Sequence, residues 1–348
     1  MAAPLTGEQL RAFETSGYAL LESPLTPDQL DSAEDAFDRL IQVRQTHSQA
    51  VLSQALATDP PFVELISHPW FESVAKQLLR SEQVRLIELG PSQFRPGTGE
   101  SRSAEAEADN WRSGAHLDIQ VSASGFDATP RQDMLACWFW VSDVPAERGA
   151  MRILPGSHRP IQEHWERTLT PEHRAMLPRH QVLRPQPSDT TQETWSNHPE
   201  YIPEPVDFPF TECEPMPVVA KRGTAQFFTQ SLLHSVRPPR PGPLTPQRFA
   251  ALTHPFGRAQ AWHNSDTQPR KGMRISWVPL DVSVGFRSPR LEDLRRMFPL
   301  LRESVARWQP GREHIVSDEE EFCHVVNTGE QWEETFFEGR APAERPRL

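Results

Sequence analysis

The stretch "CWFWVSDVPAERGAMRILPGSHR", residues 137–159, decides the fold of this chain. It begins as an apolar, aromatic run, passes through a turn that contains Asp143, and continues as a second short apolar run before Pro155 and Gly156. Apolar runs of this length that end at Pro or Gly are typical of β-strands joined by turns. The stretch therefore predicts two short strands that follow each other closely.

The same punctuated pattern covers most of the chain from about residue 84. Short runs rich in β-branched and aromatic residues recur, among them "VRLIELGPSQF", "AHLDIQVSA", "TAQFFTQ", "RFAALTH" and "MRISWVPLDV". The 35 Pro and 17 Gly among 348 residues keep such runs short, because both residue types interrupt regular structure. We expect a mostly β fold with flanking helices, built as an antiparallel barrel or jelly roll.

Both ends of the chain carry helical patterns instead. Apolar residues follow helical spacing on either side of "GYALLE" (17–22), so we expect two helices that flank a short strand there. Thr26 followed by Pro27 is a typical helix start. Helical spacing returns in "SPRLEDLRRMFPLLRESVARW", residues 288–308. These patterns predict a helical segment over 1–83 that packs on the barrel, a β-core over 84–285, and a helical extension over 286–348.

Two stretches of the predicted core read as inserted loops. Residues 96–110 are small, acidic and aperiodic, and residues 184–218 are polar and rich in proline. Either loop could border a binding site or could be passive surface.

Composition excludes several classes of protein. A net charge of -11 without a basic stripe argues against a nucleic-acid binder, and no apolar run approaches the ~18 residues of a membrane span. The three cysteines, Cys137, Cys213 and Cys323, are widely spaced and form no CxxC pair, so we expect free buried thiols. We expect a soluble, cytoplasmic protein that binds neither nucleic acid nor membrane.

A histidine and an aspartate stand two residues apart in "SGAHLDIQV", residues 113–121. Residues i and i+2 of a strand point to one face, so His116 and Asp118 can offer a nitrogen and an oxygen to one metal ion. The pattern alone is not decisive, because His164/Glu166 and His198/Glu200 have the same spacing. A third ligand could be His234, which follows the apolar run of "RGTAQFFTQSLLHS". Two histidines and one carboxylate leave open positions that suit non-haem Fe(II).

Three blocks of the sequence resemble the phytanoyl-CoA dioxygenase-like family of Fe(II)/2-oxoglutarate oxygenases. "AHLD", "CWFWVSDVPAERGAMRILPGSHR" and "RGTAQFFTQSLLHS" occur in the order and approximate spacing seen in that family. The opening "LTGEQLRAFETSGYALLE" is also similar to the family's usual start, so the resemblance spans roughly residues 6–280.

The resemblance implies a double-stranded β-helix (a jelly-roll or cupin-like barrel) with a catalytic iron. It implies that His116, Asp118 and His234 are the metal ligands, whereas His164 and His198 are surface residues. Its cofactor would be Fe(II), and its co-substrates would be 2-oxoglutarate and O₂. Family members often carry an aromatic residue directly before the first histidine, where this chain has Ala115.

The resemblance also implies an arginine that pairs with the far carboxylate of 2-oxoglutarate, and three candidates exist. Arg248 lies 14 residues after His234, close to the family's spacing, and Arg274 forms an Arg-x-Ser pair with Ser276. Arg270 lies 36 residues after His234, or 11 (36 minus 25) if the 25 residues 236–260 are a third insertion. That insertion restores both the spacing and an Asn-containing turn, so we expect Arg270 to bind 2-oxoglutarate.

The function implied by the resemblance is hydroxylation of a small molecule, such as a secondary metabolite, coupled to conversion of 2-oxoglutarate and O₂ into succinate and CO₂. An acyl-CoA substrate is not favoured, because its phosphates would need a basic patch. The alternatives are a non-catalytic jelly-roll protein that binds a small molecule, and a different outcome of the same chemistry, namely desaturation or ring formation. The sequence leaves the oligomeric state open.

Overall fold

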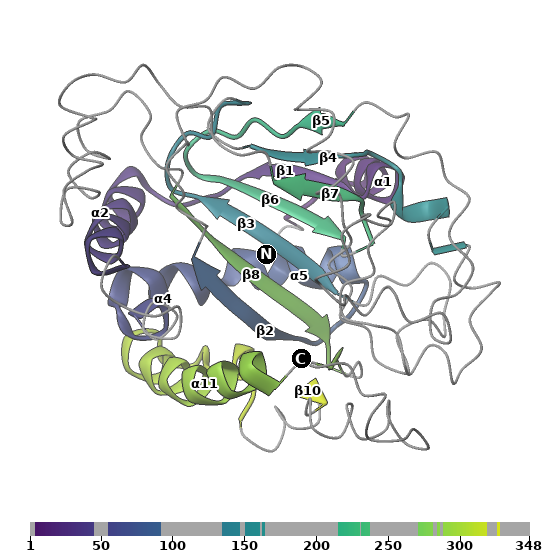
Figure 1. The fold of residues 1–348 in the computed structure, drawn as a ribbon. Coiled ribbons are helices and arrows are strands. Elements are labelled where there is room, and N and C mark those ends of the chain that lie inside the picture. Colours follow the sequence, from purple (N-terminus) through teal and green to yellow (C-terminus); the bar gives the residue numbers. More distant parts are fainter. Residues whose placement is uncertain are drawn as a thin grey trace, which may run out of the picture.

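The structure consists of two antiparallel sheets with helices against one of them (Figure 1). The computed structural model describes residues 4–44, 55–91, 134–146, 150–160, 162–163, 215–229, 231–236, 271–280, 284–285, 288–318 and 326–327. These residues show the expected combination of antiparallel strands and flanking helices.

The larger sheet has five strands in the order β1-β6-β3-β8-β2, and every neighbouring pair is antiparallel. Its strands are β1 (Tyr18–Glu22), β2 (Val84–Pro91), β3 (Leu135–Trp140), β6 (Thr224–Thr229) and β8 (Gly272–Pro279). β1 is the short strand expected between the two N-terminal helices, and its backbone bonds to β6 make it an edge strand of this sheet.

The smaller sheet has three short strands in the order β5-β4-β7, also antiparallel. They are β4 (Met151–Ile153), β5 (Met216–Pro217) and β7 (His234–Val236). A separate parallel pair joins β9 (Val284–Gly285) to β10 (Val326–Asn327). The stretch at 137–159 thus forms β3 and β4 as predicted, one strand in each of the two main sheets.

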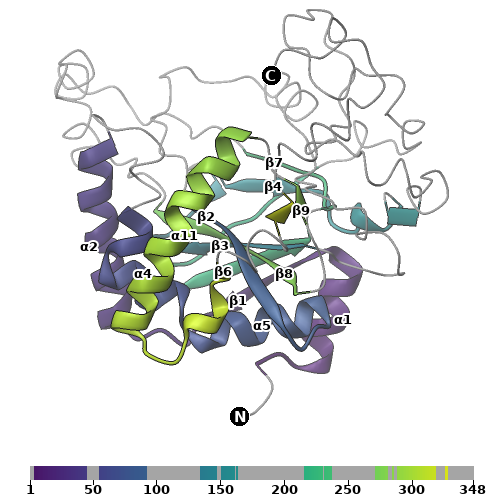
Figure 2. The same ribbon diagram turned by 90° about the horizontal axis from the view of Figure 1, so that it is seen from below.

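Helices cover one face of the larger sheet, and the smaller sheet lies on its other side (Figure 2). The helices are α1 (Gly7–Ser16), α2 (Pro27–Arg44), α4 (Pro60–Ile66), α5 (Pro69–Leu79) and α11 (Ser288–Trp308), and a 3₁₀ turn, η3, spans Glu313–Ile315. None of the described helices is long and apolar enough to cross a membrane.

Local side-chain signals begin both N-terminal helices, and the one at Thr26 is the predicted start. Thr6 caps α1 through a capping box with Gln9, in which each side chain accepts a hydrogen bond from the other residue's backbone N–H. Thr26 and Gln29 form the same reciprocal bonds at the start of α2, with N–O distances of 3.3 and 2.9 Å. The helix predicted at 288–308 is α11.

Alternation along β8 separates the two faces of the larger sheet. Met273, Ile275 and Trp277 belong to the main apolar core, which the helices share. Arg274 and Ser276 lie between them in the sequence and contact Glu88 of β2 instead. We call the face of Arg274 and Ser276 the inner face, because it is the one directed toward the smaller sheet.

Cys137 of β3 is a free, fully buried thiol in the main core, as predicted for the cysteines. Burial raises the pKa of its thiol well above the ordinary value, so the neutral form persists. Cys213 and Cys323 lie outside the described residues.

Candidate functional site

His234 begins β7 and is almost fully buried, at 2% exposure, opposite Ile153 of β4. The ring of Phe228 meets the imidazole edge-on, with centroids 5.3 Å apart. The imidazole Nδ1 lies 2.9 Å from the carbonyl oxygen of Leu232, and a carbonyl can only accept, so Nδ1 carries the proton. In the neutral ring Nε2 is then unprotonated, which is the form that binds a metal.

The turn after β4 holds the residue that precedes His234. The Leu233 N–H donates to the Ser157 hydroxyl at 2.9 Å, and the Leu154 N–H donates to the Leu233 carbonyl at 3.0 Å. Gly156 of the same turn donates its N–H to the carbonyl of Ser16 at the end of α1. The "LPGS" part of the opening stretch therefore positions the predicted distal ligand and ties it to the N-terminal helix.

Most of the other predicted site residues lie outside the residues that the structure describes, namely His116, Asp118, Arg248 and Arg270, as well as His164 and His198. In the part of the chain that the structure describes, no three His, Cys, Asp or Glu side chains gather as a metal site would require. The assignment of His116 and Asp118 as ligands stays a prediction.

The inner face carries stacked aromatic rings beside a buried amide. Trp138 and Trp140 of β3 stack with ring centroids 5.5 Å apart and an interplanar angle of 14°. The Trp140 indole N–H donates to the Gln226 side-chain oxygen at 3.4 Å, and the Gln226 amide contacts the Met151 sulfur at 3.1 Å. Met151 belongs to the smaller sheet, so these contacts join the two sheets.

Arg274, one of the three arginine candidates, pairs with a carboxylate of the protein itself. Its Nε lies 3.1 Å from Oε2 of Glu88, and the Ser276 hydroxyl donates to the same oxygen at 2.9 Å. Glu88 is 4% exposed and reaches the inner face because β2 changes register between Leu86 and Glu88. Sequence reasoning missed Glu88, since nothing local signals a partner 188 residues away.

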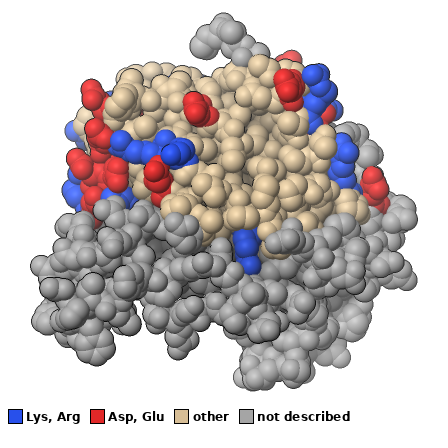
Figure 3. Space-filling model, turned by 90° about the horizontal axis from the view of Figure 1, so that it is seen from above, with Lys and Arg blue, Asp and Glu red and all other residues tan. Residues whose placement is uncertain are grey.

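The described surface has no continuous basic area on the face shown in Figure 3. Acidic and basic side chains stand next to one another near its edges, and uncharged residues occupy most of its centre. A surface that tracks phosphates would gather basic residues instead.

Several solved structures are similar to this chain. EctD from S. alaskensis, solved with 2-oxoglutarate and 5-hydroxyectoine, is 15% identical, with a TM-score of 0.49 over 81% of this chain and 79% of that chain. The non-heme alpha ketoglutarate dependent epimerase SnoN from nogalamycin biosynthesis is 16% identical, with a TM-score of 0.44 over 80% of this chain and 84% of that chain. The carbocyclase SnoK from the same biosynthesis is 15% identical, with a TM-score of 0.45 over 83% and 90%.

A comparison with curated proteins finds no match to the sequence. The profile of the family described as Phytanoyl-CoA dioxygenase (PhyH), in contrast, matches residues 13–240, which is more than half of the chain. This match confirms the resemblance of the three sequence blocks, and with it the expected Fe(II), 2-oxoglutarate and O₂. The chain therefore belongs to the phytanoyl-CoA dioxygenase family of iron- and 2-oxoglutarate-dependent oxygenases.

Proposed function

We propose that this chain is a non-haem Fe(II)/2-oxoglutarate-dependent dioxygenase that hydroxylates a small molecule, with His116, Asp118 and His234 as its iron ligands. The observation that carries the proposal is the state of His234. Its ring is buried at the start of a strand, and the backbone carbonyl that Nδ1–H faces selects the tautomer in which Nε2 is unprotonated, the form that coordinates metals.

The path of the chain between the two sheets supports a double-stranded β-helix. In chain order β3 lies in the larger sheet, β4 and β5 in the smaller, β6 in the larger, β7 in the smaller and β8 in the larger. β2 and β3 are both in the larger sheet, so a double-stranded β-helix would have one more strand of the smaller sheet between them. The predicted strand at 113–121 falls there in the sequence and would bring His116 and Asp118 beside His234 on β7.

The family's chemistry assigns each part of the proposed site a role. Bound iron would couple the oxidative decarboxylation of 2-oxoglutarate by O₂ to oxidation of the substrate. Two histidines and one carboxylate would occupy one side of the metal and leave the other side for the co-substrates. Burial of His234 and the aromatic rings of Trp138 and Trp140 would keep water away from that side.

Arg270 is the arginine that we propose to hold the far carboxylate of 2-oxoglutarate. Arg274 already has the carboxylate of Glu88 at 3.1 Å, so it is the weaker candidate. Arg274 and Ser276 of β8 face inward, and the same alternation continued before Gly272 would turn Arg270 toward the inner face. Its planar guanidinium suits a bidentate pair with a carboxylate.

Succinate formation tests the reaction class. Protein supplied with Fe(II), 2-oxoglutarate, ascorbate and O₂ should release succinate, and this release should rise with a hydroxylatable small molecule whose product gains one oxygen atom. The Asp118→Ala variant should lose the coupled reaction and still fold, because a ligand at the barrel mouth does not hold the core together. A product that lacks two hydrogens would favour desaturation or ring formation instead. A protein that binds small molecules but never consumes 2-oxoglutarate would favour the non-catalytic alternative and contradict the proposal.

A further inference from the structure

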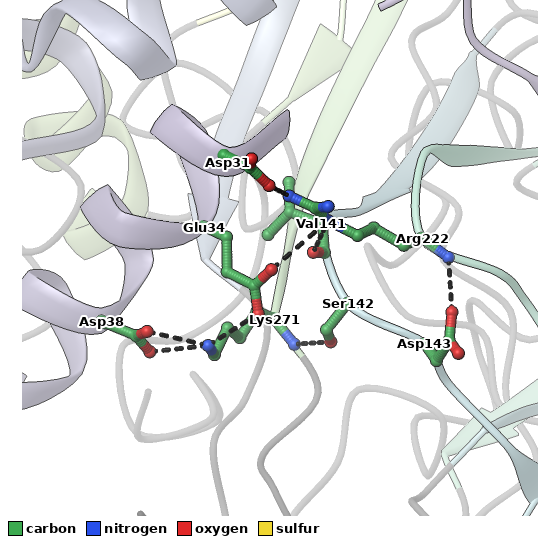
Figure 4. Close-up of polar contacts among 8 residues, drawn as sticks. All are labelled: Asp31, Glu34, Asp38, Val141, Ser142, Asp143, Arg222 and Lys271. Carbon is green, nitrogen blue, oxygen red and sulfur yellow. Dashed lines mark hydrogen bonds and ion pairs between the residues drawn. The ribbon is translucent and has the colours of Figure 1, made fainter. Parts of the chain in front are cut away.

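Lys271, directly before β8, carries a buried charge between two acidic residues of helix α2 (Figure 4). Its side chain is only 7% exposed, and its ammonium lies 2.9 Å from Oε1 of Glu34 and 2.7 Å from Oδ1 of Asp38. We call Lys271, Glu34 and Asp38 the Lys271 clamp.

The backbone of Lys271 is held as firmly as its side chain. Its N–H donates to the Ser142 hydroxyl at 2.8 Å, and its carbonyl accepts a hydrogen bond from the Val141 N–H at 3.0 Å. Every polar group of Lys271 thus has a partner, either on α2 or on the turn after β3. The residue has little freedom to move relative to these two elements.

A second basic residue ties the same helix to the same end of the sheet. Arg222, just before β6, pairs with Asp31 and lies 3.3 Å from Oε2 of Glu34. Its backbone N–H donates to Oδ1 of Asp143 at 2.8 Å (Figure 4). Glu34 is therefore shared between the strand ends that lead into β6 and β8. Within the part of the chain that the structure describes, Asp38 pairs with Lys271 and Asp31 pairs with Arg222.

A buried ion pair is a poor way to gain stability, because removing the charges from water offsets most of their attraction. An apolar side chain of similar volume at position 271 would pack against α2 at no such cost. The two charge-assisted hydrogen bonds of Lys271 fix the position of its ammonium group. An apolar side chain makes no such directional contacts. The clamp is therefore suited to setting position more than to adding stability.

We propose that the Lys271 clamp positions the 2-oxoglutarate site. Arg270 precedes Lys271 in the sequence, and consecutive Cα atoms are about 3.8 Å apart, so a displaced Lys271 displaces the arginine with it. Helix α2 then fixes the position of Lys271, the residue to which Arg270 is joined, and Lys271 is a positioning residue that does not itself touch 2-oxoglutarate. This inference rests on the proposed function, because it requires a 2-oxoglutarate site at the start of β8.

The dissociation constant of 2-oxoglutarate, measured by calorimetry on full-length protein loaded with Mn(II), tests the proposal. Replacing Lys271 by Met keeps an unbranched side chain but removes the charge. Lys271→Met should weaken 2-oxoglutarate binding about tenfold, the usual scale for loss of a residue that orients a ligand-binding group. Asp38→Asn should weaken it less, since Glu34 remains, and Lys271→Arg should restore part of the loss. The affinity for Mn(II), measured without 2-oxoglutarate, should be unchanged in these variants. A general loosening of the fold would instead lower the affinity for Mn(II) as well.

Two matched controls lie on the same helix. Arg39→Ala breaks an α2 ion pair to Asp59 that touches no strand, and Asp31→Asn breaks a contact of Arg222 and leaves Lys271 in place. Both should leave 2-oxoglutarate affinity unchanged. An unchanged affinity in a folded Lys271→Met variant would overturn the proposal, as would equal losses in the two controls. If Lys271→Met does not fold, Asp38→Asn replaces it in the test, and an unchanged affinity of Asp38→Asn for 2-oxoglutarate would overturn the proposal.

Arg270→Ala, measured in parallel, separates this inference from the proposed function. Loss of a bidentate charge-assisted pair should weaken 2-oxoglutarate binding about thirtyfold. No effect of Arg270→Ala would reject that arginine as the anchor, whatever Lys271→Met does. A large effect of Arg270→Ala together with none of Lys271→Met would reject the clamp alone.

Discussion

Gly272, the first residue of β8, lies where an added methyl group would have no space. An ideal Cβ at this position would be 2.5 Å from Cε3 of Trp140 and 2.6 Å from the carbonyl oxygen of Phe139. The missing side chain thus permits Trp140 to lie over the start of the strand. Gly272→Ala should lower the free energy of unfolding by about 1–3 kcal/mol through overpacking, as measured by urea denaturation.

Gly90 of β2 provides a control for this substitution within the same sheet. A Cβ there would meet nothing within 4 Å, and its strand partner is Arg274. Gly90→Ala should be neutral or slightly stabilising, because alanine loses less backbone entropy on folding. Equal effects of the two substitutions would show that close approach of Trp140 is not the cause.

At the same scale, the role of a side chain could be predicted from the sequence only where the residue lies in a recognisable local motif. His234 was predicted as a ligand because it follows a Gly turn and an apolar strand; the structure places it, buried, at the start of β7, and its ligand role stays a prediction. Glu88 and Lys271 were not predicted, since their roles come from partners on distant elements. In particular, the register shift that turns Glu88 inward leaves no local sequence signal.

At the scale of elements, helix α5 is joined to the turn η3 by a buried carboxylate. Glu72 lies 2.7 Å from the ammonium of Lys76 and 2.6 Å from the guanidinium of Arg312, and the His314 ring is 3.2 Å away. Burial alone would raise the pKa of this carboxyl, but the bonds and charges of Lys76 and Arg312 outweigh it and lower the pKa below the ordinary value. The folded state therefore favours the ionised form.

This carboxylate makes acid stability depend on Glu72. Its contribution is fully present above the unfolded pKa of about 4.3 and is lost as pH falls through the lower folded pKa. Glu72→Gln should reduce the free energy of unfolding by about 2 kcal/mol at neutral pH, and the difference from the parent should shrink on acidification. Glu82→Gln, which changes an exposed carboxylate, should have little effect. A difference that grows as pH falls would contradict the assignment.

Elements differ in how well the sequence predicts them, for a physical reason. The starts of α1 and α2 depend on residues three positions apart, which is why Thr26 could be predicted as a helix start from the sequence. Strand pairing depends on distant partners: β1 pairs with β6 and β2 with β8, and neither pairing follows from a local pattern. Consequently β1 was expected as a strand, but its place at the edge of the larger sheet was not.

At the scale of the whole molecule, the two faces of the larger sheet carry different kinds of side chain. The helix-covered face holds most of the apolar core, whereas the inner face carries polar and aromatic groups such as Glu88, Gln226 and Trp138. This division supports the antiparallel, helix-flanked fold expected from sequence. The closed double-stranded β-helix, the boundaries at residues 83 and 285, and the ligand roles of His116 and Asp118 stay predictions, because they depend on residues outside the described part of the chain.

The central claim for the whole molecule is a single iron site built from His116, Asp118 and His234. Anaerobic titration with Fe(II) in the presence of 2-oxoglutarate tests it without knowledge of the substrate. The parent protein should bind one Fe(II) per chain, and His116→Ala, Asp118→Ala and His234→Ala should each lose that site while remaining folded. His164→Ala and His198→Ala remove histidines with the same His-x-acid spacing and should keep one Fe(II). Full iron binding by folded His116→Ala or His234→Ala, or its loss in His164→Ala, would contradict the account.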